Sequence, residues 1–325
     1  MKLPRRAFLH LAASAAALTA LSRTASAQAY PTRPVRLIVP FGPAGATDIT
    51  ARLIGHWLSE RLGQQFIIEN RPGAGGNIGT EAVVRAPPDG YTLLYVTTAN
   101  ASNATLYDKL NFNFIHDIAP VAAIISFPYI MVVNPSVPAK TLPEFIAYAK
   151  ANPGKINMAS PGIGSTPHVN GELFKVMTGT NMVHVPYRSA AAVMTDLLSG
   201  QVQLYFGTTA SSLEYVRTGK LRALGVTIER RLDALPEIPT VAEFVPGYEA
   251  SNWYGVGAPK ATPVEIIDKL NNEISAGLAD PNMKARFADL GGTVLAGSPA
   301  DFGKLIADET EKWAKVVKFA GIKAD

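Results

Sequence analysis

The sequence predicts an α/β fold made of two lobes, each a mainly parallel sheet covered by helices. The chain has 325 residues, which is more than one small domain and about the length of two α/β lobes. Hydrophobic residues make up 47% of the chain and charged residues 17%, so each lobe has enough apolar side chains to bury a core. Short apolar segments alternate with longer amphipathic ones, an order typical of parallel strands connected by helices.

The first series of elements spans residues 35–97. Buried strands are predicted where short apolar runs end in turn residues, and helices where apolar residues recur with helical spacing. In the first helix, Ile49, Leu53 and Trp57 fall on one face. We expect strands at Val35–Phe41, Phe66–Glu69 and Tyr91–Thr97, and helices at Thr47–Leu62 and Asn77–Arg85.

A second series with the same alternation begins at Tyr129. The expected strands are Tyr129–Asn134, Asn157–Ala159, Met182–Val185, Leu204–Gly207 and Arg222–Thr227, and the helices are Leu142–Asn152, His168–Thr178, Ala190–Ser199 and Ser211–Thr218. A strand at Trp253–Ala258 and helices at Pro263–Ala279 and Pro299–Ala320 close the chain. We therefore assign residues 28–127 and 253–325 to the first lobe and residues 128–252 to the second.

The N-terminus, residues 1–27, is typical of an export signal. Lys2, Arg5 and Arg6 precede a stretch rich in alanine and leucine. The segment Ala25–Ala27 then fits a small-x-small cleavage site, so cleavage is predicted after Ala27. The paired arginines resemble the twin-arginine export motif, and general secretion is the alternative. Either route predicts that the mature protein lies in the periplasm.

Charge and cysteine content exclude several classes of protein. Four of the 30 basic residues and none of the 26 acidic ones lie in the first 27 positions, so the remaining chain carries balanced charge. A basic surface for nucleic acid is therefore not expected. The chain has no cysteine, which excludes disulfides, thiolate catalysis and cysteine-ligated metals. It also excludes lipid anchoring through an N-terminal cysteine, and no later apolar run is long enough to span a membrane.

Three glycine-rich loops are the predicted ligand-binding segments: residues 42–48, 71–77 and 162–168. Each follows a predicted strand and precedes a helix, which is where ligands sit in open α/β sheets. Glycine lets a ligand approach the backbone, and free N–H groups at a helix N-terminus favour an anion. Hydroxyls at Ser165 and Thr166 add donors, so a carboxylate could be bound without a buried cation. The alternative is that these are ordinary turns with capping hydroxyls.

Motifs for catalysis, cofactors and metals are missing. Ile78 replaces the third glycine of the dinucleotide-binding fingerprint, and the sequence contains neither a GKS/GKT phosphate loop nor a G-x-S-x-G elbow. His168 and Glu172 have the spacing of two metal ligands on a helix, but no third ligand is spaced to complete a site. Ser165 and His168 are interpreted as a cap and a rim residue, and His184 as a hydrogen-bonded strand residue. We predict no catalytic residue, metal or cofactor; a hydrolase is a remote alternative.

The chain resembles the tripartite tricarboxylate transporter substrate-binding family, also called the Bug receptors. Seven blocks, in the same order along the chain, carry the resemblance. They are residues 39–48 (VPFGPAGATD), 70–79 (NRPGAGGNIG), 88–93 (PDGYTL), 184–188 (HVPYR), 196–202 (DLLSGQV), 219–224 (GKLRAL) and 239–243 (PTVAE). The resemblance covers nearly the whole mature chain.

The resemblance implies a two-lobed periplasmic-binding-protein fold with a small organic carboxylate in the cleft between the lobes. It also implies delivery of this ligand to one small and one large membrane transporter subunit. We expect the protein to be a monomer. Backbone amides and ordered waters would hold the carboxylate. Carried over by position, the expected ligand-binding residues are Phe41, Gly45, Ala46, Asp48, Thr98 and Asn100 in the first lobe, and Ser165, Thr166, His168, Arg188, Ser189 and Thr208 in the second.

Two departures from the family pattern bear on the ligand. Ser189 stands where the family usually has glycine, which narrows that loop. Gly207 and Thr208 stand where many members have aspartate, so a partner for an ammonium group is missing. A non-amino mono- or dicarboxylate is therefore expected. The fold does not distinguish transport from a periplasmic sensing role that feeds a signalling partner.

Overall fold

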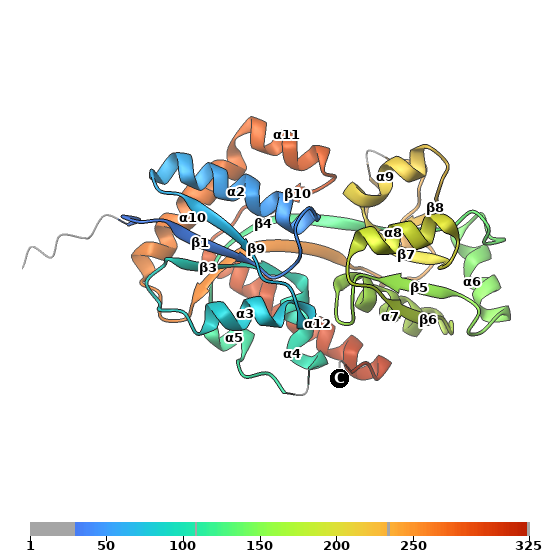
Figure 1. Cartoon of the computed structure of the whole chain (residues 1–325). Helices are drawn as coiled ribbons and strands as arrows, with labels where there is room; N and C mark the ends of the chain where they lie inside the picture. Colours follow the sequence, from blue (N-terminus) through green and yellow to red (C-terminus); the bar gives the residue numbers. More distant parts are fainter. Residues whose placement is uncertain (1–29, 108, 233–234, 324–325) are drawn as a thin grey trace, which may run out of the picture.

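The structure is a computed structural model that describes residues 30–107, 109–232 and 235–323. The predicted export signal, residues 1–27, lies outside the described residues. Two lobes stand side by side, joined by two long strands, β4 (Ile118–Val133) and β9 (Ser251–Pro259) (Figure 1). The predicted two-lobed α/β fold is confirmed.

The sheet of the first lobe has a parallel and an antiparallel part. β1 (Val35–Val39) lies between β2 (Phe66–Asn70) and β3 (Thr92–Thr97) and is parallel to both. β3 then pairs antiparallel with β9, and β9 with the first part of β4. The short strand β10 (Thr293–Val294) also pairs antiparallel with β4.

β4 changes partners after Pro128 and so contributes to both lobes. Ile118–Pro128 pair with β9, whereas Tyr129–Val133 pair antiparallel with β7 (Leu204–Thr208) and β8 (Arg222–Val226). β5 (Asn157–Ser160) is parallel to both β7 and β6 (Val183–Pro186). The expectation of mainly parallel sheets is wrong on this point. Both sheets are mixed because the connecting strands β4 and β9 run antiparallel to every strand they pair with.

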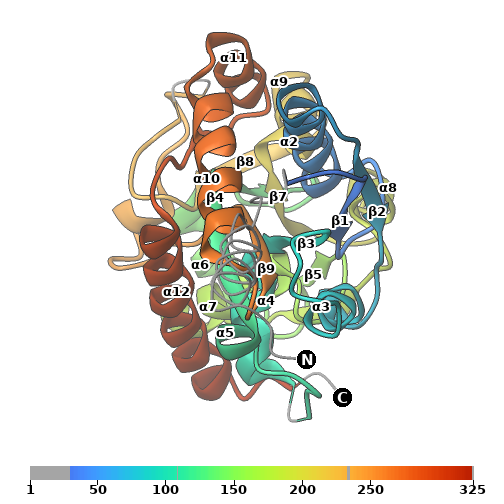
Figure 2. The same ribbon diagram turned by 90° about the vertical axis from the view of Figure 1, so that its left-hand side faces the viewer.

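Helices cover both faces of the first lobe's sheet (Figure 2). Successive residues of a strand point to opposite faces. Leu37 and Tyr95 pack on the side of α2 (Ala46–Leu62) and α10 (Val264–Ala279), whereas Ile38 and Leu94 pack on the side of α3 (Asn77–Val84), α4 (Thr98–Leu106) and α12 (Pro299–Ala320). The other helices are α5 (Phe114–Asp117), α6 (Leu142–Ala151), α7 (Thr166–Thr178), α8 (Ala190–Ser199), α9 (Thr209–Arg217) and α11 (Pro281–Asp289), with 3-10 turns η2 (Ala74–Gly76) and η3 (Val241–Glu243).

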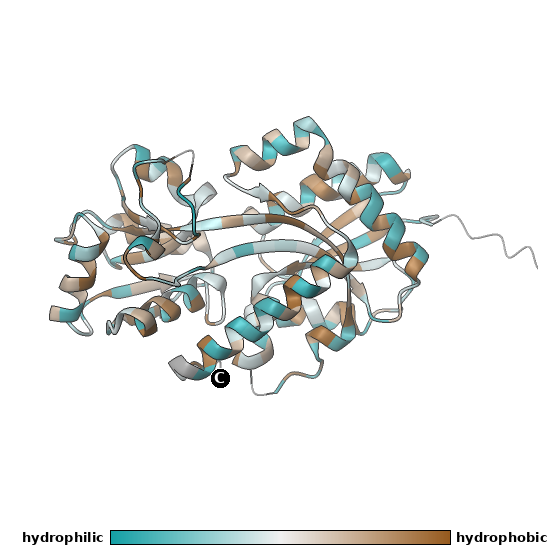
Figure 3. Cartoon of the chain, turned by 180° about the vertical axis from the view of Figure 1, so that it is seen from behind, coloured by the Kyte–Doolittle hydropathy of each residue, from teal (hydrophilic) through white to brown (hydrophobic). Residues whose placement is uncertain are grey.

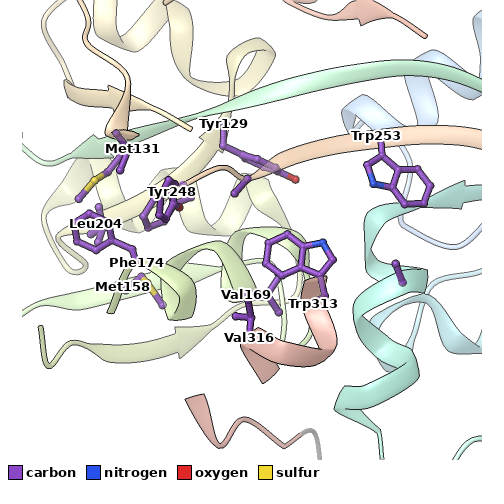
Figure 4. Close-up of a cluster of buried hydrophobic side chains, with 14 of the residues drawn as sticks. Tyr129, Met131, Met158, Val169, Phe174, Leu204, Tyr248, Trp253, Trp313 and Val316 are labelled. Carbon is purple, nitrogen blue, oxygen red and sulfur yellow. The ribbon is translucent and has the colours of Figure 1, made fainter. Parts of the chain in front are cut away.

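One hydrophobic cluster continues from the first lobe into the second. Trp313 and Val316 of α12 lie next to Val169 of α7, and Tyr129 and Tyr248 extend the cluster towards β4 and β9 (Figure 4). Helix α12 therefore packs against both lobes, and its length of 22 residues lets it reach from one to the other.

The buried face of α2 differs from the predicted one. Ile49 is 38% exposed, and the buried apolar residues are Ala51, Ile54 and Leu58. Trp57 lies at the margin of that face, where its Nε1 donates to Glu273 O of α10 at 2.8 Å. Helices elsewhere show hydrophilic and hydrophobic residues on different faces (Figure 3). In the part of the chain that the structure describes, no helix has the length and apolar character needed to cross a bilayer.

Candidate functional site

The three predicted loops lie at the carboxyl ends of β1, β2 and β5, each close before a helix. The first two are in contact, since a methyl group on Gly76 would lie 3.6 Å from the Phe41 ring. Helix α4 contacts the second and third: Asn103 Nδ2 donates to Gly75 O at 2.9 Å, and a methyl group on Gly164 would lie 2.9 Å from Asn103 Oδ1. Two loops of the first lobe and one of the second therefore meet around α4.

The N-terminus of α2 carries no side-chain cap. Its N-cap residue is Gly45, and free space surrounds the positions where side chains on Gly42 and Gly45 would stand. Ala44 has φ of 64°, in the left-handed region, and this conformation turns the chain into the helix. Uncapped N–H groups, here those beginning at Ala46, and the positive end of the helix dipole together favour an anion.

Asp48 braces this loop from inside. The residue is 3% exposed. Its Oδ2 accepts hydrogen bonds from Ala44 N–H at 3.0 Å and Arg52 Nε at 2.9 Å, and its Oδ1 accepts one from Asn70 Nδ2 at 3.0 Å. Burial acts to raise the pKa of this carboxyl, but the hydrogen bonds from Arg52, Ala44 and Asn70 outweigh it and hold the pKa below its ordinary value. Both carboxylate oxygens thus have partners within the first lobe.

Two imidazoles hold the loop of the second lobe. Gly164 N–H donates to His168 Nδ1 at 3.1 Å. His184 Nε2 lies 2.6 Å from Ser160 Oγ, at the end of β5. His184 is therefore a hydrogen-bonded strand residue, as the sequence predicts.

In the same loop, the carbonyl oxygen of Gly162 accepts hydrogen bonds from two hydroxyls. Ser160 Oγ and Ser165 Oγ both donate to Gly162 O, at 2.9 and 2.6 Å. Thr166, the next residue, is buried and its side chain hydrogen-bonds the Tyr129 hydroxyl. The loop is thus a compact turn fixed by its own hydroxyls and by β4.

The other predicted residues of the first lobe are buried within it. Trp253 N–H donates to Thr98 Oγ1 at 2.9 Å, which ties α4 to β9. Asn100 Oδ1 accepts Thr97 N–H at 2.8 Å, and its Nδ2 donates to Thr80 Oγ1 at 2.7 Å. These contacts make Thr98 and Asn100 supports of the helix α4.

The remaining predicted residues of the second lobe lie at helix N-termini or on the surface. Ser189 and Thr208 are the N-caps of α8 and α9, where their hydroxyls accept Ala192 N–H at 3.2 Å and Ser211 N–H at 3.3 Å. Arg188 is exposed and has no hydrogen-bond or ion-pair partner among the described residues. Direct ligand contact by any of the predicted residues stays a prediction.

Some buried polar side-chain atoms lack a hydrogen-bond partner among the described residues. Within the described ranges, the buried side-chain atoms that lack one are Asn77 Nδ2, Asn103 Oδ1 and both amide atoms of Asn170. Asn77 belongs to the predicted loop 71–77, but Asn103 was missed. No sequence signal identified it because its helix, α4, was itself not predicted.

Two features bear on metal binding and catalysis: groups of side chains that could ligate a metal, and the Ser160–His184 pair. No group of three or more His, Cys, Asp or Glu side chains in the described residues could hold a metal ion. The Ser160–His184 pair has the spacing of a nucleophile and base, but Ser160 is fully buried and its hydroxyl donates to Gly162 O.

A cavity of about 150 Å³ lies between α9 and the turn after α11. Thr209, Leu213, Glu214, Arg217, Asp289, Leu290 and Gly291 line it. None of these belongs to the predicted site, which is formed by loops around the N-termini of α2, α3 and α7.

Similar proteins of known sequence span nearly the whole chain. BugT of Bordetella pertussis is 36% identical over 310 residues, which is 94% of this chain and 95% of BugT. The protein encoded in the tcbD–tcbE intergenic region of Pseudomonas sp. strain P51 is also 36% identical over 310 residues, covering 94% of this chain and 92% of that protein.

Solved structures are similar in fold as well as sequence. Rpa4515 of R. palustris with adipate has a TM-score of 0.85 and 38% identity, covering 90% of this chain and 99% of that one. MatC (Rpa3494) of Rhodopseudomonas palustris with bound malate has a TM-score of 0.83 and 31% identity, covering 89% of this chain and all of that one (100%).

A family model described as the tripartite tricarboxylate transporter family receptor matches residues 50–322. This match confirms the resemblance carried by the sequence blocks. The chain belongs to the tripartite tricarboxylate transporter receptor family.

Proposed function

We propose that this chain is a periplasmic receptor that binds a small organic carboxylate between its lobes, as a monomer, and delivers it to one small and one large membrane transporter subunit. Family membership supports the receptor role, and the adipate and malate in two similar structures support a carboxylate ligand. We assign residues 28–127 and 253–325 to the first lobe and residues 128–252 to the second. The change of partners in β4 after Pro128 supports the boundary between residues 127 and 128.

The single observation that carries the proposal is the uncapped N-terminus of α2, with open space beside Gly42 and Gly45. A carboxylate placed there accepts hydrogen bonds from backbone N–H groups and lies at the positive end of the helix dipole. Charge-assisted bonds to fixed donors are stronger than neutral ones. Arg188 is exposed on the second lobe, and we propose that its positive charge attracts an anionic ligand.

The ligand is a non-amino mono- or dicarboxylate. An ammonium group needs an acceptor, and burying one unpaired costs several kcal/mol. Asp48 already accepts three hydrogen bonds within its own lobe. Position 207 supplies no carboxylate either, because it is glycine, and a methyl group there would already lie 2.0 Å from Ser212 Oγ.

Isothermal calorimetry tests both parts of the proposal. Succinate, adipate, benzoate, aspartate and glutamate are titrated into the mature protein. We expect dissociation constants in the micromolar range or below for at least one of the first three and none measurable for the amino acids. Binding of aspartate or glutamate alone would overturn the ligand class, and failure of all five, together with a wider panel of organic acids, would overturn the receptor function.

A further inference from the structure

Two buried asparagines lie where the second and third loops meet α4. Asn77, the first residue of α3, is 6% exposed, and Asn103 of α4 is 1% exposed. Asn103 Nδ2 donates to Gly75 O at 2.9 Å and to Asn77 Oδ1 at 3.1 Å. Asn77 Nδ2 and Asn103 Oδ1 then have no partner in the part of the chain that the structure describes.

The orientation of both amides follows from one backbone group. A carbonyl oxygen only accepts hydrogen bonds, so the Asn103 atom that faces Gly75 O must be the nitrogen. Asn103 Nδ2 also faces Asn77, which therefore presents its oxygen. The two atoms left over are one acceptor, Asn103 Oδ1, and one donor, Asn77 Nδ2.

Asn103 Oδ1 lies at the contact between the lobes. A methyl group on Gly164, in the second lobe, would lie 2.5 Å from Leu106 Cδ2 and 2.9 Å from Asn103 Oδ1. Separation of the lobes would expose this oxygen to water, and closure removes it from water again. A buried polar atom without a partner is unfavourable, so the closed arrangement is favoured when a ligand supplies that partner.

We propose that Asn77 and Asn103 form a hydroxyl-binding subsite for the ligand. A hydroxyl group donates to Asn103 Oδ1 and accepts from Asn77 Nδ2, directly or through one water, and satisfies both. A carboxylate is repelled by Asn103 Oδ1, and an ammonium group leaves Asn77 Nδ2 unpaired. The subsite therefore selects hydroxycarboxylates over acids of the same length without the hydroxyl. This inference rests on the receptor function proposed above and specifies its substrate class.

Malate and succinate form a matched pair of probes because they differ by one hydroxyl. In the wild-type protein we expect malate to bind at least about tenfold more tightly, since one buried hydrogen bond contributes about that factor. In Asn77→Ala and Asn103→Ala, the ratio of malate to succinate affinity should fall to about one, because any change in the loop affects both acids alike and only malate loses the bond to its hydroxyl.

Asn77→Asp is a second test of the subsite, for the case in which the alanine variants do not fold. Its carboxylate still accepts from Asn103 Nδ2, but it presents an oxygen in place of the free donor, so the preference for malate should disappear. Asn271→Ala is the control: this buried asparagine donates to Val121 O at 2.8 Å and Gly297 O at 3.1 Å, away from the three loops. It should lower the melting temperature and leave the ratio of malate to succinate affinity unchanged.

The outcomes separate the two proposals. Equal affinity for malate and succinate in the wild-type protein, or a malate preference that survives in folded Asn77→Asp, overturns the subsite and leaves the receptor function intact. Binding of neither acid, nor of any other carboxylate tested, overturns the receptor function and the subsite with it.

Discussion

The imidazole rings of His168 and His184 stack with their centroids 3.7 Å apart and their planes 16° from parallel. One ring comes from α7 and the other from β6, and each holds the same loop, through Gly164 and Ser160. Burial, the neighbouring His184 and Lys175 lower the pKa of His168 to about 3. Burial and Lys175 lower the pKa of His184 to about 4. The stacked pair is therefore neutral at neutral pH.

This pair predicts a loss of stability on mild acidification. Both folded-state pKa values lie below the ordinary value of 6.5, so the unfolded chain binds more protons as the pH falls below about 6.5. The free energy of unfolding should then decrease by up to about 1.4 kcal/mol per pH unit for each histidine. Urea unfolding at pH 7, 6, 5 and 4.5 measures the slope. His168→Gln should reduce it, whereas His56→Gln, on the exposed face of α2, should not; equal slopes in all three proteins would contradict the assignment.

The hydrogen bonds of Asp48 lead us to expect that ligand affinity depends on the conformation of the loop around Gly45. Asp48→Asn keeps the shape of the side chain but removes charge-assisted hydrogen bonds, and should cost about 1–3 kcal/mol of stability. Ligand affinity should fall by at least about tenfold, because the loop around Gly45 loses its brace. Asp308→Asn, which breaks an exposed ion pair with Lys304, should change neither by much. Wild-type affinity in Asp48→Asn would mean that the loop holds its conformation without this carboxylate.

Glu309 predicts a strong dependence of stability on one carboxylate. Its Oε2 accepts from Trp253 Nε1 at 3.2 Å and from Trp313 Nε1 at 2.9 Å. Glu309→Ala leaves two buried indole N–H groups unpaired and should lower the free energy of unfolding by about 2–4 kcal/mol. Glu311→Ala, on the exposed side of the same helix, should change it by less than about 0.5 kcal/mol. Chemical denaturation of both variants makes the comparison, and similar values would refute the role of Glu309.

Export can be tested on the signal itself. If the twin-arginine route is used, Arg5→Lys together with Arg6→Lys should leave uncleaved precursor in the cytoplasm. Fractionation and immunoblotting report the distribution. Normal amounts of processed protein in the periplasm of the double variant would identify general secretion as the route.

Strands and helices with a regular apolar pattern could be predicted from the sequence, and those without one could not. Helix α12 was predicted with its observed bounds because its apolar residues recur with helical spacing and Pro299 marks its start. Helix α4 was not predicted, since Thr98–Leu106 is rich in Thr, Asn and Ser and nearly all of it is buried. It has no polar face to give a period, and such residues have low helix propensity.

The first part of β4 was missed for a different reason. Pro120 and Pro128 lie in Ile118–Pro128, and proline within a strand argues against a central strand. The structure accommodates this stretch with irregular register against β9 near Pro120 and Ala123. The loops of the site were found because glycines mark them, whereas the contact between Asn103 and Gly75 depends on tertiary packing that no local pattern encodes.

The shared strands have a consequence for biosynthesis. β3 ends at Thr97 and pairs with β9, which begins at Ser251, so a ribosome must add the whole intervening segment before β3 gains this neighbour. At typical elongation rates of about 5–20 residues per second, that interval is roughly eight to thirty seconds. An unpaired strand edge is exposed to aggregation during that time. The sheet of the first lobe therefore cannot be completed until β9 has left the ribosome. Every strand of the second lobe's sheet, from the last part of β4 to β8, precedes β9 in the chain, so the second lobe can complete its sheet first.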